Sequence, residues 1–149
     1  MWRRLRNLFH SVQTYGILSP DLVARRLVNQ SLSQRPAMTQ EQWFQAFCQP
    51  MGVTPAVATF AYTHLQHYSG IQFARVIASD RLVEDLHWFE VCWADWEMAF
   101  CEDFWHSFGI DISDPLLNYP LSTVGEFVLF LNVQLLTLTS SEDDSVNSK

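Results

Sequence analysis

The sequence has only three cysteines, Cys48, Cys92 and Cys101, and none stands in C-x-x-C spacing. An odd number of cysteines among apolar neighbours does not predict a disulfide framework or a zinc site. The pattern favours reduced, buried thiols and a cytoplasmic type of compartment. No continuous apolar segment follows the arginines near the N-terminus, so we expect no secretory signal.

Motifs for common enzymatic chemistry are also missing. There is no G-x-S-x-G, no glycine-rich phosphate loop and no E-x-x-H di-metal pattern. His64 and His67 stand three residues apart, but the sequence supplies no further ligand that must lie near them. Cys92 lies five residues after His87, and a buried thiol is the favoured interpretation over a thiol–imidazole pair. We therefore expect no catalytic activity, no metal and no cofactor.

Basic residues are scarce beyond residue 40. Residues 1–40 carry a net charge of +5, whereas the remainder carries −12 from three basic and fifteen acidic residues. Apolar residues make up 48% of the 149-residue chain, enough for one core of ordinary size. The acidic field of the body would repel phosphates, which disfavours nucleic acid as a partner. A protein partner with a basic surface fits this charge better.

Residues 1–36 predict a basic helical arm. Apolar residues recur at spacings of three and four before Gly16, so they share one side of a helix. Three interpretations stay open: packing against this or another chain, binding to an anionic membrane surface, and an organellar presequence. The residues predicted to make the arm or membrane contact are Trp2, Arg3, Arg4, Arg6 and Phe9.

Local start signals predict three further helices. Ser19-Pro20 is typical of an N-cap followed by proline and predicts a helix to about Leu32. Thr39 and Gln42 have capping-box spacing. Thr54-Pro55 starts a helix that Ser69-Gly70 ends, and residues 71–82 then form a long connection. The predicted buried side of that helix consists of Val57, Phe60, Ala61, Leu65 and Tyr68.

The stretch from Glu84 to Phe104 predicts a loop entering one long helix that starts near Phe89 or Glu90 and runs to about Phe108. The central segment of acyl carrier proteins reads E-D-L-G-x-D-S-L, followed by a helix that runs to M-A-L-E-E-E-F. When residues 84–104 are aligned to that segment without gaps, seven residues are identical to the family pattern. These are Glu84, Asp85, Leu86, Met98, Ala99, Glu102 and Phe104. The run at 109–112 (G-I-D-I) matches the family's helix exit, and the run at 123–126 (T-V-G-E) matches its last helix entry. Residues 54–138 therefore resemble the acyl-carrier-protein family.

The resemblance implies an all-α fold, with an acyl-carrier-like four-helix bundle over residues 37–139 and an N-terminal helical extension over 1–36. The family's phosphopantetheine serine falls on Glu90, and no Ser or Thr occurs between Asp80 and His106. The implied scaffold therefore lacks its prosthetic group. The last helix, about twelve residues from Thr123, is too short and polar to span a bilayer. Residues 140–149 predict a disordered acidic tail.

Four tryptophans between residues 88 and 105 exceed what a small helical core normally holds. Exposed indoles are typical interface anchors, and this is the helix that the family uses to recognise partners. The residues predicted to bind a partner are Glu90, Trp93, Asp95, Trp96, Glu97, Glu102 and Asp103. The sequence thus predicts a cytoplasmic, non-catalytic adaptor or regulator. Two alternatives remain: a peripheral membrane protein anchored by the arm, and a module that binds an acyl or other apolar ligand.

Overall fold

The computed structural model describes residues 19–147, with side chains described through residue 137. The predicted N-terminal helix and its contact residues, Trp2, Arg3, Arg4, Arg6 and Phe9, lie outside the described residues. Within the described part the chain is all-helical, and the backbone bridge between Arg81 and Thr123 is isolated rather than part of a strand. The predicted all-α class is confirmed.

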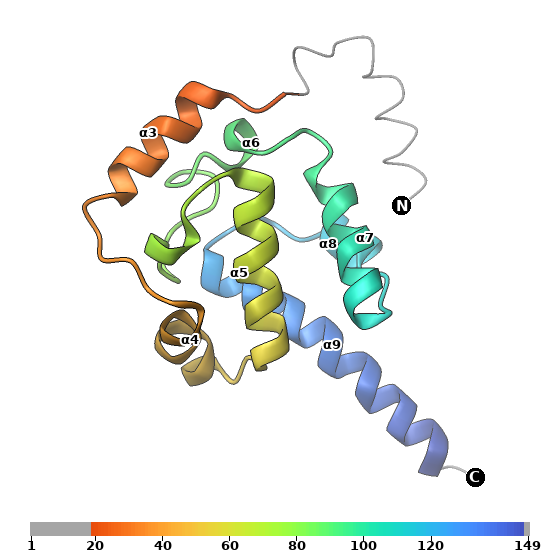
Figure 1. Cartoon of the computed structure of the whole chain (residues 1–149). Coiled ribbons are helices and arrows are strands. Elements are labelled where there is room, and N and C mark those ends of the chain that lie inside the picture. Colours follow the sequence, from red (N-terminus) through yellow and green to blue (C-terminus); the bar gives the residue numbers. More distant parts are fainter. Residues whose placement is uncertain (1–18, 148–149) are drawn as a thin grey trace.

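The elements follow one another in a simple order along the chain (Figure 1). They are α3 (Leu22–Leu32), α4 (Gln40–Trp43), a π-helical turn (Phe44–Cys48), a 3-10 turn (Gln49–Met51), α5 (Pro55–Ser69), a 3-10 turn (Phe73–Arg75), α6 (Trp88–Val91), α7 (Trp96–Phe108), α8 (Ser113–Leu117) and α9 (Val124–Asn147). Figure 1 shows α5 in the middle, with α3 and α4 to one side and α7 and α8 to the other.

Helix α5 supplies the centre of the core. All five residues predicted for its buried side are buried, so that prediction is confirmed. Phe60 packs edge-on against Phe100 and Phe104 of α7, with 5.4 Å between ring centroids in both pairs. Phe127 of α9 contacts Phe100 at 5.5 Å. An aromatic cluster therefore joins the three longest elements of the body, and such pairs contribute beyond their buried area.

The predicted ends of α4 and α5 are correct, whereas the N-cap of α3 and the role of the Thr54 hydroxyl differ from the prediction. Thr39 and Gln42 form the capping box, and Gly70 ends α5 in the left-handed region at φ +66°. The N-cap of α3 is Asp21 rather than Ser19, because its carboxylate accepts two backbone N–H groups of the first turn. The hydroxyl of Thr54 makes no cap hydrogen bond and instead donates to Asn132 of α9 at 3.1 Å.

Helix α3, which the sequence assigned to the arm, packs on the body. Its residues Val28 and Leu32 are buried in the core. Arg25 donates from Nε to the carbonyl of Val91 at 2.7 Å and from Nη2 to the carbonyl of Tyr68 at 3.2 Å. These hydrogen bonds tie α3 to the ends of α5 and α6, so residues 22–32 are part of the folded body.

An ion pair between the partly exposed Arg35 and the buried Asp80 holds the connection between α5 and α6. Asp80 is 4% exposed, and Arg35 reaches it with two parallel hydrogen bonds of 2.6 and 2.9 Å. One carboxylate oxygen of Asp80 also accepts a hydrogen bond from the backbone N–H of Ile77. The backbone carbonyl of Asp80 accepts a hydrogen bond from the backbone N–H of Val124. Charged groups are tolerated in a core when paired and hydrogen-bonded in this way. The pair therefore fixes the long connection against the start of α9.

The prediction of a twelve-residue last helix was wrong, since α9 has 24 residues and ends at Asn147. It extends past the body in Figure 1 and includes residues 140–147, for which the sequence predicted a disordered tail. No glycine or proline occurs after Gly125, so no residue there breaks the helix. No helix of the described part combines the length and hydropathy that crossing a membrane requires.

Candidate interaction surface

Two separate helices replace the single helix predicted to run to about Phe108. Helix α6 ends at Val91, the backbone of Cys92 is extended (φ −88°, ψ 155°), and α7 begins at Trp96. On one continuous helix, at about 100° per residue, the buried residues here would spread over most of the circumference. These residues are Trp88, Val91, Cys92, Trp96, Phe100, Cys101 and Phe104. The break lets each helix turn its own buried residues inward, and it places Glu90 within α6.

An apolar groove of about 300 Å³ is lined by α6, the start of α7 and the segment from α8 to α9. We call it the aromatic groove; it consists of Val83, Phe89, Trp96, Glu97, Leu116, Leu117, Tyr119 and Leu121. Phe89 is 59% exposed and Leu117 is 51% exposed. Trp93, in the loop between α6 and α7, is 44% exposed. Large exposed apolar side chains beside a groove are typical of binding surfaces.

The structure separates the residues predicted to bind a partner. Glu90 is exposed on α6, and Asp95 is half-buried immediately before α7. Trp96 is only 4% exposed and packs edge-on against Trp88, with 5.7 Å between ring centroids. Its ring therefore belongs to the core and to the wall of the aromatic groove, not to an exposed face. Glu97 lines the same groove.

The two predicted residues farther along α7 have different surroundings. Asp103 is half-buried and accepts a hydrogen bond from the Tyr68 hydroxyl of α5, and its Oδ2 lies 3.4 Å from His64 Nδ1. Burial raises the pKa of Tyr68, and the hydrogen bond to Asp103 raises it further. Asp103 is thus engaged inside the protein, whereas Glu102 is exposed.

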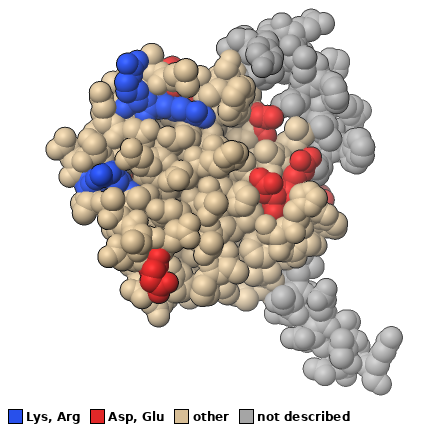
Figure 2. All heavy atoms as spheres, viewed as in Figure 1, with Lys and Arg blue, Asp and Glu red and all other residues tan. Residues whose placement is uncertain are grey.

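Charge is divided between two sides of the molecule. Figure 2 shows the Lys and Arg side chains on the side of α3 and most of the visible carboxylates on the side of α7. Thirteen of the sixteen acids occur in residues 82–148, which contain no Lys or Arg. Ion pairs of arginine within the described residues involve Asp80 and Asp85, both of which precede α6. The surface formed by α6 and α7 is therefore acidic.

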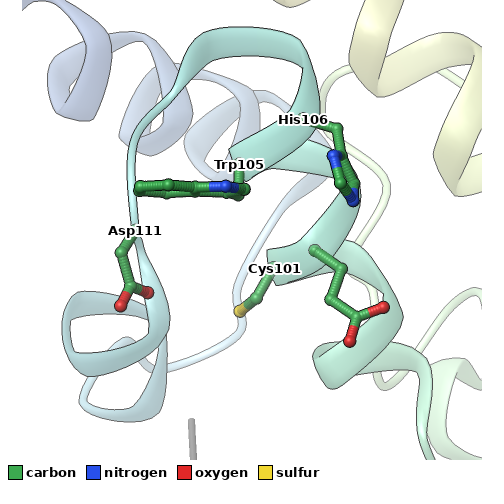
Figure 3. Close-up of a pocket in the computed structure, with 5 residues that line it drawn as sticks. Cys101, Trp105, His106 and Asp111 are labelled. Atoms are coloured by element: carbon green, nitrogen blue, oxygen red, sulfur yellow. The ribbon is translucent and has the colours of Figure 1, made fainter.

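A second pocket, of about 460 Å³, opens beside the last turns of α7 (Figure 3). We call it the α7 pocket; it is lined by Cys101, Glu102, Trp105, His106 and Asp111. The Trp105 indole, in a residue 54% exposed, reaches from α7 toward the segment that carries Asp111. The hydroxyl and backbone N–H of Ser113 donate to Asp111 and hold the pKa of its carboxyl below the usual value. A carboxylate and an aromatic ring thus border one opening.

The residues considered for catalysis and metal binding do not converge. Cys92 is buried, and burial raises the pKa of its thiol, so the thiol is protonated at neutral pH. His87 is exposed. On α5, His64 is half-buried beside Asp103, whereas His67 is exposed. In the part of the chain that the structure describes, no three His, Cys, Asp or Glu side chains form a metal-ligand group.

Sequence reasoning missed several residues of the two cavities. Phe89 and Leu117 were not considered as surface residues, although Phe89 is the most exposed large aromatic of the described part. The sequence analysis counted Trp105 among the four tryptophans of residues 88–105 without indicating its exposure, and it placed Asp111 in the predicted helix exit. The excess of tryptophans was the available signal, but it could not indicate which rings are exposed. The sequence matches no protein-family model and no curated protein, and the structure matches no solved structure.

Proposed function

We propose that this protein is a non-catalytic adaptor or regulator that binds a partner protein through the surface of α6 and the start of α7. The observation that carries the proposal is the exposure of two aromatic side chains on an acidic part of the chain: Phe89, 59% exposed, lines the aromatic groove, and Trp93, 44% exposed, lies in the loop between α6 and α7. Aromatic side chains are enriched at protein interfaces, where burying them in a partner supplies much of the affinity.

The acidic surroundings favour a basic partner. Glu90 and Asp95 flank Trp93 in the sequence, and Glu97 lines the aromatic groove. Complementary charge speeds the encounter between two proteins, while an apolar anchor slows their dissociation. We therefore expect a partner segment that carries lysine or arginine around at least one apolar residue.

The proposed scaffold is acyl-carrier-like. The order supports it: α5, a long connection, α7, the short α8 and then α9 follow one another as in that family's four-helix bundle. The residues that precede α6 and α7 are His87 and Asp95, so neither helix starts at a side chain that could accept a phosphopantetheine group. The proposal is a scaffold of this kind that keeps an acidic docking face.

Affinity capture from an extract of the source cells tests the proposal. The bait proteins are the unchanged chain, the variants Trp93→Ala and Glu90→Lys, and two controls. Trp105→Ala removes an exposed tryptophan away from the aromatic groove, and Glu41→Lys reverses an exposed charge on α4. The specific partner should be retained by both controls and lost by Trp93→Ala.

Binding of the purified partner then gives the decisive measurement. Calorimetry should show roughly thirty-fold weaker binding to Trp93→Ala, the size expected when a central aromatic anchor is removed. Glu90→Lys should mainly slow association, and more so at low salt. A partner that binds all five proteins equally would contradict the assignment of this surface.

The aromatic groove also supports a second candidate, an apolar small molecule. Its volume of about 300 Å³ and its mainly apolar lining suit a short acyl chain or a similar ligand. Native mass spectrometry of the purified protein tests this directly. A bound mass that disappears on Leu117→Asp would favour ligand binding over the adaptor role.

A further inference from the structure

Helix α3 exposes a mainly apolar side. Leu22, Val23 and Leu27 are 68, 55 and 59% exposed, although they lie on a helix that packs on the body. At about 100° per residue these three residues and Arg26 fall within one half of the circumference, whereas the buried Val28 lies on the other half. We call Leu22, Val23, Arg26 and Leu27 the α3 face. Large apolar side chains that are grouped on one face, rather than scattered singly, are typical of an interaction surface.

The charge of the α3 face complements that of the surface proposed for docking. Arg26 is exposed and forms no ion pair with the described residues. We call Phe89, Glu90 and Trp93 the α6 face, and the carboxylate of Glu90 is likewise exposed and without an ion pair in the described part of the chain. One face therefore presents an arginine among aliphatic side chains, and the other presents a glutamate between two exposed aromatic rings. This protein thus carries both halves of a complementary pair.

The two faces lie close together on the molecule. The backbone N–H of Asp21, the N-cap of α3, donates to the carbonyl of Glu90 at 2.8 Å, and Arg25 Nε donates to the carbonyl of Val91 at 2.7 Å. Figure 2 shows, in a single view, basic side chains on the α3 side and carboxylates on the α7 side. A second copy turned by half a turn would bring the basic part of each molecule to the acidic part of the other.

We infer that the partner of the α6 face is a second copy of this chain, which docks its α3 face there in a two-fold dimer. Arg26 of each copy pairs with Glu90 of the other copy, and the aliphatic side chains of α3 pack on the rings of Phe89 and Trp93. A two-fold axis repeats every contact, so two small faces act together as one larger interface. This inference rests on the proposed function, because it names the partner that the same surface binds.

Sedimentation equilibrium of the full chain tests the inference. The unchanged protein should form dimers that dissociate on dilution. Arg26→Glu and Glu90→Arg each bring like charges together at both contacts, so each should raise the dissociation constant about thirty-fold. Trp93→Ala should weaken the dimer to a similar extent because it removes an aromatic anchor. The control Glu126→Arg reverses an exposed charge on α9 and should leave the dissociation constant unchanged.

Mixing the two charge variants gives the decisive measurement. In a mixed dimer of Arg26→Glu with Glu90→Arg, one contact is native and the other has both charges reversed, so both contacts join opposite charges. The mixture should therefore associate at least about ten-fold more tightly than either variant alone. A mixture of Arg26→Glu with the Glu126→Arg control regains only one of the two contacts and should pair more weakly. Native mass spectrometry with one variant labelled with ¹⁵N identifies the mixed dimers.

Three results would overturn the inference. The first is a chain that stays monomeric, and the second is a pair of charge variants that do not restore each other's association. In both cases a different protein whose binding is lost on Trp93→Ala would still support the proposed function. The third is self-association that survives Trp93→Ala, which would also count against the α6 face as a docking surface. Pelleting of a monomeric chain with anionic vesicles, lost on Arg26→Glu, would assign the α3 face to lipid instead.

Discussion

Trp43 and Trp88 form a matched pair that tests how hydrogen bonding contributes to the core. Both are 1% exposed. The indole N–H of Trp43 donates to the carbonyl of Val76 at 2.9 Å. The indole N–H of Trp88 is buried without a hydrogen-bond partner among the described residues. Replacement by phenylalanine removes a similar volume at each site but has opposite consequences for the polar groups.

The expected difference follows from the cost of a buried polar group without a partner. Trp43→Phe deprives the buried Val76 carbonyl of its donor, whereas Trp88→Phe removes an N–H that is already unpaired. Since each such group costs about 1–3 kcal/mol, Trp43→Phe should lower the free energy of unfolding by about 2 kcal/mol more than Trp88→Phe. For a chain of this length that difference corresponds to roughly 4–8 °C in Tm.

Urea unfolding followed by far-UV circular dichroism measures both variants without relying on fluorescence from six tryptophans. Equal m-values would show that the comparison concerns stability rather than the extent of unfolding. The control is Trp105→Phe, whose exposed side chain should change stability by less than about 0.5 kcal/mol. Equal losses at Trp43 and Trp88, or a larger loss at Trp88, would refute the reasoning.

Three other changes have expected outcomes. Arg35→Met should lower the free energy of unfolding by about 3 kcal/mol in urea, because the buried Asp80 carboxylate loses its partner; Asp80→Asn in the same chain should recover part of that loss. Stability should fall as pH rises from about 9 to 11, because burial raises the pKa of Cys48 from 9.0 to about 11 and only the unfolded thiol ionises in that window. Cys48→Ala should reduce this alkaline loss in unfolding curves but not abolish it, because burial also raises the pKa of Cys92 and Tyr68; an unchanged slope would contradict the reasoning. Gly70→Ala should lower Tm more than Gly109→Ala. Both glycines have φ near +70°, so an alanine is strained at either position. Only at Gly70 would the added Cβ also lie 3.0 Å from the guanidinium of Arg25 on α3.

The predictions that succeeded depend on interactions within one or two turns of helix. The capping box of Thr39, the stop at Gly70 and the buried side of α5 involve residues at most a few positions apart. Backbone geometry alone relates such neighbours, so the sequence contains the full pattern. The predicted length of the last helix was wrong for a related reason. A polar segment does not end a helix unless a residue in it breaks the backbone pattern.

The candidate sites depended on residues far apart in the chain. Phe89 of α6 and Leu117 of α8 line one groove although 28 positions separate them, and Glu102 and Asp111 line one pocket although the end of α7 and Gly109 lie between them. The break between α6 and α7 also depends on tertiary packing, because it allows each of the two helices to bury its own apolar residues. Neither spacing nor composition reports which side of a helix another element covers.

By itself the sequence determined the all-helical class, the starts of α4, α5 and α9, the division of charge and the absence of a hydroxyl near residue 90. These are properties of local backbone geometry and of residue identity. Only the tertiary structure decided that Trp96 is buried while Trp93 and Phe89 are exposed, that Asp103 is held by Tyr68, and that α3 belongs to the body. The physical reason is that burial is a property of the packed assembly, and each side chain competes for the core with residues that the sequence places far away.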